Sequence, residues 1–275
     1  MSENQPIVTP RLVEQFVKPF RVLSLGAGVQ SSTMAMMMAH GEIEKADLVV
    51  FADTCAEPAA VYKWLGWLVP RIKMPFVQVM AGEGYTAAIE AACAGKTNRL
   101  STPPLFTANG GRIHRQCTWD YKVTPIRREI RRFCKQAVMV RGISFDERHR
   151  AKPCTDVKWI THDHPLVDLQ ISRYDCLRWM NEHGYPLPPR SACVYCPNRC
   201  NSEWQKMRNT APEDFAEACR IDDLIRNKIP GMKEEVFLHR QCVPLRDADL
   251  TIGTDPDQLT FVGNGWADCD GMCGA

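Results

Sequence analysis

Short apolar segments alternate with helix-like segments through the first half of this chain. The strand-like segments are 20–26, 46–53, 74–80 and 136–142, and the helix-like segments are 31–41, 59–69 and 124–135. This alternation is typical of βαβ units, in which neighbouring strands run parallel and helices cover the sheet. The sequence therefore predicts an α/β fold with a mostly parallel sheet and helices on both faces. Ligands of such sheets bind beyond the carboxyl ends of the strands, so we expect functional residues directly after Leu25, Phe51, Met80 and Val140.

The second half of the chain has a different character. We expect a helix over 171–184, with Ser172 as its N-cap and Gly184 at its end. A proline-rich turn follows, then helices near 201–209 and 212–228 and an irregular tail after 243. This change predicts three parts, listed by residue number as an N-terminal extension 1–18, an α/β domain 19–168 and a smaller helical, cysteine-rich region 169–275.

The composition is that of an ordinary globular protein. The chain has 275 residues, of which 45% are hydrophobic and 24% charged, and its net charge is +2. No apolar run approaches the ~20 residues that a membrane-spanning helix needs. The polar N-terminus lacks the apolar stretch of a signal peptide. We therefore expect a cytoplasmic protein that does not contact membranes.

A glycine-containing segment, SLGAGVQSS at 24–32, lies between a predicted strand and a predicted helix. Gly26 and Gly28 allow the backbone to approach a phosphate closely, and the free N–H groups of the helix start donate to it. Ser31 and Ser32 add hydroxyl donors. The glycine spacing differs from the GxGxxG motif of Rossmann folds. No lysine follows the glycines, so the segment is not a Walker A loop either. The segment alone predicts either a phosphate loop or an ordinary strand-to-helix turn.

The same segment resembles the PP-loop of the adenine-nucleotide α-hydrolase superfamily, whose usual form is Ser-Gly-Gly-x-Asp-Ser. The resemblance implies a nucleotide site made by Ser24, Gly26, Ala27, Gly28, Gln30, Ser31 and Ser32. Gln30 stands where the family usually has Asp. This replacement leaves open whether magnesium is used in the usual way.

Two further segments match the superfamily in the same order. Residues 51–58, FADTCAEP, are similar to its Asp-Thr-Gly-x-x-x-Pro block, which implies that Asp53 and Thr54 lie near the adenosine. Residues 114–128 resemble its Arg-x-Cys-Thr…Lys-x-x-Pro segment. The positions that match there are Arg115, Cys117, Lys122 and Pro125.

A fourth segment, 142–150, resembles Gly-Ile-x-x-x-Glu-x-x-Arg. Its matching positions are Gly142, Ile143, Glu147 and Arg150. Four segments in the right order resemble most the phosphoadenosine phosphosulfate (PAPS) reductase family, including its members from phages and mobile elements. The resemblance implies a Rossmann-like (HUP-type) fold, with nucleotide binding in the 19–168 domain. It also implies ATP or PAPS as the adenine nucleotide, with Mg²⁺ as a companion ion.

Basic residues far outnumber acidic ones between 111 and 152, which the near-neutral total hides. A local excess of this kind suits a polyanion, either the phosphates of a nucleotide or an RNA or DNA backbone. For 127–132 a solvated basic helix face is an equal alternative. For Arg115, Lys122 and Arg150 we favour phosphate contacts, because these residues lie in the family-matching segments.

Clustered cysteines indicate a metal or an iron–sulfur cluster. Cys193 and Cys196 form a CxxC in a proline-bounded turn, which places two thiolates on one ion or cluster. The pattern resembles the iron–sulfur members of the superfamily, which implies a 4Fe–4S cluster on Cys117, Cys193 and Cys196, with Cys200 as a fourth ligand. The alternative is a tetrahedral zinc site that joins the CxxC to Cys269 and Cys273.

The C-terminal Cys273-Gly274 resembles the mobile tail of sulfonucleotide reductases only in its Cys-Gly pair. A flexible thiol near the nucleotide attacks sulfur if neighbouring basic groups lower its pKa. The candidate catalytic residues are therefore Cys117, Lys122, Arg150 and Cys273.

Three functions follow from these features. The leading one is ATP-dependent sulfur transfer, in which the enzyme adenylates a nucleic acid or nucleotide, releases pyrophosphate and lets a thiolate- or cluster-held sulfur displace AMP. A sulfur donor protein is a partner that this reaction allows. In that reaction basic side chains neutralise charge developing in the transition state. The second is a PAPS or adenylyl sulfate reductase that releases sulfite with the help of a thiol reductant. The third is a non-catalytic nucleotide- or nucleic-acid-binding protein with a structural zinc, and a homodimer is compatible with each.

Overall fold

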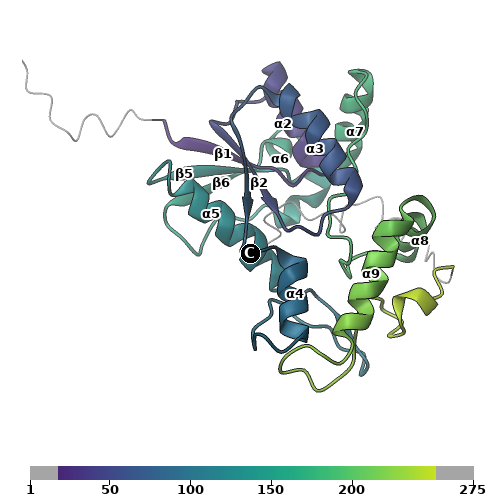
Figure 1. Ribbon diagram of the computed structural model, residues 1–275. Coiled ribbons are helices and arrows are strands. Elements are labelled where there is room, and N and C mark those ends of the chain that lie inside the picture. Colours follow the sequence, from purple (N-terminus) through teal and green to yellow (C-terminus); the bar gives the residue numbers. More distant parts are fainter. Residues whose placement is uncertain (1–17, 252–275) are drawn as a thin grey trace, which may run out of the picture.

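A five-stranded parallel sheet forms the centre of the computed structural model, which describes residues 18–251 (Figure 1). Its strand order is β3-β2-β1-β5-β6, and all four pairings are parallel. The strands are β1 (Phe20–Ser24), β2 (Leu48–Asp53), β3 (Phe76–Met80), β5 (Ala137–Arg141) and β6 (Ile160–Asp163). The predicted Rossmann-like α/β sheet is confirmed.

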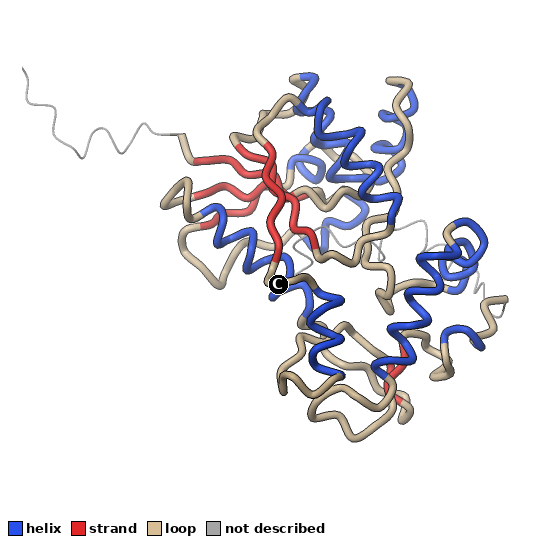
Figure 2. Tube along the Cα trace, viewed as in Figure 1, coloured by secondary structure: helices blue, strands red, loops and turns tan. Residues whose placement is uncertain are grey.

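Helices cover both faces of this sheet (Figures 1 and 2). One face carries α2 (Val29–His40), α3 (Ala59–Ile72) and α7 (Arg173–Glu182), and the other carries α5 (Thr124–Ile130). Successive side chains of a strand point to opposite faces. Accordingly Leu23 belongs to the core under α2, α3 and α7, whereas its neighbour Val22 belongs to the core under α5.

A second core lies in the part of the molecule that holds α4 (Tyr85–Cys93), α8 (Asn201–Thr210) and α9 (Pro212–Ile225), below the sheet in Figure 1. The remaining elements are β4 (Phe106–Thr107), which pairs antiparallel with β7 (Val236–Phe237), the short helix α6 (Pro165–Asp168), a π-helix η1 (Trp119–Val123), and the 3-10 helices η2 (Phe145–Arg150) and η3 (Leu245–Asp247). Within residues 18–251, no helix has the length and apolarity needed to cross a membrane.

The second core draws on residues from both halves of the chain. Tyr85 and Ile89 of α4 pack there with Trp204 of α8 and Ile221 of α9. In contrast, Cys176 and Met180 of α7 pack with the sheet. The contacts of α4 with α8 and α9 therefore join the two halves of the chain in one core. The domain division at 168 stays a prediction.

Local capping follows the sequence closely at α7. Asp175 N–H donates to Ser172 Oγ at 3.2 Å, and Ser172 N–H donates to the Asp175 carboxylate at 3.0 Å, which is a reciprocal capping box. Gly184, beyond the last turn, has a φ of +67° that favours glycine. The predicted N-cap and helix end are confirmed. The helix expected over 124–135 is shorter, because the chain turns after Ile130.

Candidate functional site

The loop of residues 25–28 after β1, which we call the glycine loop, lies at the point of the sheet where the strand order reverses. The chain leaves β1 for α2 on one face and reaches β5 from α5 on the other, so β1 and β5 are neighbours with connections on opposite sides. In open α/β sheets this switch point opens a crevice beyond the carboxyl ends of the strands, and ligands bind there. Residues 25–28 after β1 and Gly142 after β5 both lie at this crevice.

The loop is held in one shape by short-range hydrogen bonds. Ala27 adopts a left-handed backbone with φ of 59°, which is uncommon for a residue with a side chain. Gly26 N–H donates to Ser31 Oγ at 3.2 Å, and Ser32 N–H donates to the Gly28 carbonyl at 3.0 Å. The helix α2 therefore begins directly at the loop, with its first free N–H groups at the crevice.

The predicted serines of the loop occupy different surroundings. Ser31 is fully buried and accepts the bond from Gly26. Ser32 Oγ accepts a hydrogen bond from the Trp64 indole N–H at 2.9 Å, so it faces the core between α2 and α3. Ser24, at the end of β1, is fully buried and its hydroxyl has no partner among the described residues.

Gly142 and the loop are in direct contact across the switch point. A Cβ atom at Gly142 would lie 2.8 Å from both the Cα and the backbone nitrogen of Ser31. Real Cβ contacts are essentially never this short, so only glycine fits at 142 without moving the backbone of α2. The sequence predicts that both residues belong to one nucleotide site, and the structure brings them together.

Gln30 is the centre of a buried polar network behind the loop. Its amide nitrogen donates to Glu147 Oε2 at 3.1 Å, and its amide oxygen accepts from Arg173 Nη1 at 2.8 Å. Glu147 in turn accepts from Arg150 Nη1 at 2.6 Å. An amide at 30 can donate to Glu147, whereas an Asp there would place a second carboxylate beside it. Gln30 is thus matched to its neighbour.

Replacing Gln30 with Asp is expected to lower the free energy of unfolding by about 1–3 kcal/mol, since Glu147 loses this donor in a site closed to water. Urea denaturation at neutral pH measures this change. In the double variant Gln30→Asp, Glu147→Gln, the amide at 147 can donate to the carboxylate at 30. This variant should therefore recover part of the lost stability. Equal stability of Gln30→Asp and the parent would contradict this account.

The predicted adenosine-side residues, Asp53 and Thr54, lie at the carboxyl end of β2. The Asp53 carboxylate accepts from Cys55 N–H at 2.7 Å, from the Tyr62 hydroxyl at 2.9 Å and from Gln78 Nε2 at 2.7 Å. Burial, and then the bond to Asp53, raise the pKa of Tyr62. These three hydrogen bonds to Asp53 fix the loop after β2. Thr54 remains at the crevice, where its hydroxyl donates to Glu57 Oε1 at 3.3 Å.

Lys122 and Glu57 form a buried ion pair at the same edge. Lys122 Nζ lies 3.3 Å from Glu57 Oε1, and their side chains are only 5% and 0% exposed. Lys122 belongs to the π-helix η1, an unusual winding that occurs frequently at functional sites. Glu57 Oε2 has no partner among the described residues. Sequence reasoning missed Glu57, although it stands inside the matched segment 51–58.

A cysteine-bearing segment, 191–194, crosses the carboxyl edge of the sheet, and we call it the 191–194 strap. The Ser191 hydroxyl donates to the Gly26 carbonyl of the glycine loop. Cys193 Sγ lies 3.4 Å from Thr54 Oγ1, and Val194 N–H donates to the Ala56 carbonyl at 2.7 Å. The first cysteine of the CxxC therefore lies on the candidate nucleotide site.

The electrostatic surroundings of these thiols are uneven. Burial, and then the Glu57 carboxylate, raise the pKa of Cys193 well above its ordinary value, while Lys122 opposes them. After burial, Cys117 and Cys193 are among the causes that raise the pKa of Tyr85, and both cysteines pack against the hydrophobic cluster that contains this ring. Without a positively charged ligand, Cys193 is a neutral thiol at neutral pH.

Cys196 and Cys200 follow the strap in the chain, and both are half-buried. Burial, and then Arg190, lower the pKa of Arg199 to about 10, and the Cys196 and Cys193 thiols oppose this. Cys200 is the N-cap of α8, where its backbone N–H donates to Glu203 at 2.9 Å. Cys200 therefore has a structural role that its spacing from the CxxC did not predict.

Whether these cysteines hold an iron–sulfur cluster or zinc stays a prediction. Four thiolates around zinc lie about 3.8 Å apart, as Zn–S bonds of about 2.3 Å require. Among residues 18–251, no group of three cysteines has its sulfur atoms within 4.8 Å of one another. A cluster spaces its thiolates more widely, and the cations Lys122 and Arg199 near Cys193 would offset its negative charge. Cys269 and Cys273 lie outside the described residues.

Much of the basic stretch is used within the fold. Arg127 pairs with Asp156 at 3.0 Å and stacks on Trp119 at 5.1 Å. Arg131 stacks on the Trp159 ring at 3.8 Å. Arg150 pairs with Glu147, as described above, and Arg115 lies half-buried close to Arg112. These contacts give Arg127, Arg131 and Arg150 structural partners, and nucleic-acid contact stays a prediction.

Comparisons with known proteins add a distant similarity. No protein-family model matches the sequence, and no curated protein matches it. Among solved structures, the chain is similar to the phosphoadenylyl-sulfate (PAPS) reductase from Candida auris in its phosphate complex. The two are 12% identical over 66% of this chain and 83% of that chain, with a TM-score of 0.41. A function for this chain is therefore inferred from the topology and the site described above.

Proposed function

We propose that this chain is an adenine-nucleotide enzyme of the PP-loop type, related to the PAPS reductase family, that transfers sulfur to an adenylated nucleic-acid or nucleotide substrate. The observation that carries the proposal is the 191–194 strap. It joins the glycine loop through Ser191 and the end of β2 through Cys193. A cysteine at this place belongs to the chemistry of the nucleotide rather than to a distant structural module.

The first step would be adenylation. An oxygen of the acceptor attacks the α-phosphorus of ATP, the bond to the β-phosphate oxygen breaks, and pyrophosphate leaves. The N–H groups at the start of α2 and the loop backbone at Gly26–Gly28 would bind the phosphates. Lys122, at the same edge of the sheet, would neutralise the charge that develops on them.

The second step would be displacement. A sulfur nucleophile attacks the activated carbon, the carbon–oxygen bond breaks, and AMP leaves with its electron pair. Cys117, Cys193 and Cys196 would hold an iron–sulfur cluster, which supplies a site for sulfur when it is bound. The Tyr85, Tyr121 and Tyr195 rings around Cys117 and Cys193 would exclude water from this region.

Replacing Cys193 with Ser is expected to lower turnover at least ~100-fold while the affinity for ATP changes little, because the loop and α2 stay intact. Anaerobically purified protein is titrated with Mg-ATP and with PAPS, and pyrophosphate release, iron and acid-labile sulfide are measured on the same sample. Cys134→Ser is the matched control, since among the described residues its thiol donates to the carbonyl of Ile130, the last residue of α5, at 3.7 Å.

Preferential binding of ATP, with iron and sulfide lost in Cys193→Ser, supports the proposal. Preference for PAPS with release of sulfite would replace it with a sulfonucleotide reductase. Unchanged turnover and cluster content in Cys193→Ser would refute the role given to the strap.

A further inference from the structure

Three side chains that the nucleotide site does not use converge at the far end of the α2–α7 helix pair. His40, Glu42 and His183 are the group within residues 18–251 whose possible metal-ligand atoms all lie within 4.8 Å of one another. His40 is in the last turn of α2, Glu42 follows its C-cap Gly41, and His183 is the C-cap of α7. With about 1.5 Å of rise per residue, α2 separates this group from the glycine loop by roughly 17 Å.

Trp179 holds both His183 and Glu42 through hydrogen bonds that leave one ligand atom of each unused by Trp179. His183 Nδ1 lies 2.8 Å from the Trp179 carbonyl, which can only accept, so Nδ1 carries the proton and Nε2 keeps its lone pair. Glu42 Oε2 accepts from the Trp179 indole N–H at 2.9 Å. Its other oxygen, Oε1, lies 4.0 Å from His183 Nε2. Metal-binding histidines usually donate their second nitrogen to a carbonyl or carboxylate in this manner.

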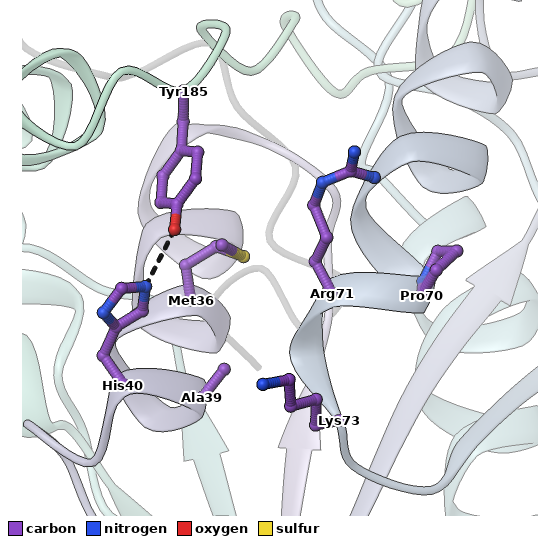
Figure 3. Close-up of a pocket in the computed structure, with 7 residues that line it drawn as sticks. All are labelled: Met36, Ala39, His40, Pro70, Arg71, Lys73 and Tyr185. Carbon is purple, nitrogen blue, oxygen red and sulfur yellow. Dashed lines mark hydrogen bonds between the residues drawn. The ribbon is translucent and has the colours of Figure 1, made fainter.

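His40 completes the group from the side of α2. Its Nε2 lies 2.9 Å from the Tyr185 hydroxyl, and its ring meets the His183 ring edge-on with centroids 5.1 Å apart. Figure 3 shows Tyr185 and His40 pointing toward each other at one side of a cavity of about 360 Å³, with Arg71 and Lys73 on the other side. The hydroxyl supplies an additional oxygen next to the two imidazoles.

The C-terminal ends of two helices add negative electrostatic potential at this group of three residues. Both α2 and α7 terminate here, and the carbonyl ends of helices carry partial negative charge that favours a cation. Bonds of about 2.0–2.1 Å to zinc would bring the ligand atoms to roughly 3.4 Å from one another. The three residues are exposed, so rotation of their side chains can close the remaining distance.

From this geometry we propose that His40, Glu42 and His183 bind a divalent transition-metal ion, with zinc as the best match. Two imidazoles and one carboxylate are a set that zinc accepts with a fourth position left for water or another oxygen. The ion fastens the C-terminal ends of α2 and α7. Their N-terminal ends already meet through the bond of 2.8 Å between Arg173 and Gln30. Metal binding therefore stabilises the helix that carries the glycine loop.

The test uses the untagged full chain, stripped of metal with a chelator and titrated with Co²⁺, followed by competition with Zn²⁺. Thiolate-bound Co²⁺ has an intense near-ultraviolet charge-transfer band, which a site of imidazole and carboxylate lacks. We expect one ion without that band and an increase of the melting temperature on adding Zn²⁺. His40→Gln and His183→Gln should each lower the affinity of this ion at least ~100-fold, and Trp179→Phe by ~10–100-fold.

The control is His114→Gln, an exposed histidine outside the group, which should bind the ion as the parent does. Melting temperatures of the metal-free variants show whether each is folded. Cobalt bound only with thiolate bands, or full affinity in folded His40→Gln and His183→Gln, would overturn the proposal. Because Cys193 takes no part in this site, the result is independent of the proposed sulfur chemistry.

Discussion

Gly142→Ala is expected to lower the free energy of unfolding by about 1–3 kcal/mol, the usual cost of forcing an additional carbon into a well-packed site. It should also abolish measurable nucleotide binding. The added Cβ would lie 2.8 Å from Ser31 Cα and N. These are backbone atoms of α2, so relief requires a shift of the helix start rather than a side-chain rotation. The loop that presents its N–H groups to a phosphate then loses its shape.

The matched control is Gly66→Ala. Gly66 lies within α3, and a Cβ atom there meets nothing within 4 Å. This substitution should stabilise the protein by up to about 1 kcal/mol, since alanine is the better helix former. Urea denaturation and calorimetric titration with ATP measure both variants. Nucleotide binding retained in Gly142→Ala would show that the loop does not need its close contact with the end of β5.

The sheet could be predicted from the sequence because its central strands are buried on both faces. β1, β2 and β5 are short apolar runs, and the predicted ranges overlap each of them. β6 could not be found in this way, because Ile160 is followed by Thr161, His162 and Asp163, and only Ile160 is fully buried. Such an edge strand carries little apolar signal, and its pairing with β5 specifies it instead.

The arrangement of the candidate site could be predicted for residues that directly follow a strand. The glycine loop and Gly142 stand directly after strands, so the parallel topology brings them together at one edge. The partners of Gln30 could not be foreseen, because Glu147 and Arg173 reach it from distant parts of the chain. The role of Glu57 could not be foreseen either, because it pairs with Lys122, which is 65 residues away in the chain.

Lys122→Met is expected to be the most destabilising single change at this site, lowering the free energy of unfolding by about 3–5 kcal/mol. The two side chains of the pair are 5% and 0% exposed, so removal of the cation leaves the Glu57 carboxylate charged in a region closed to water. Its other oxygen, Oε2, is already without a partner among the described residues. Thr54, with its bond of 3.3 Å to Oε1, cannot replace a charge.

The double variant Lys122→Met, Glu57→Gln separates stability from catalysis. Replacing both charges removes the buried carboxylate as well as its partner, so most of the lost stability should return. Thr54 can still donate to the amide oxygen that the second substitution introduces. Turnover should stay low in both variants, because both lack the Lys122 cation that is proposed to neutralise the phosphates. Denaturation and turnover assays on the four members of this cycle measure both effects. Turnover that returned together with stability would mean that the ion pair only supports the fold, and that the phosphates are neutralised by other groups.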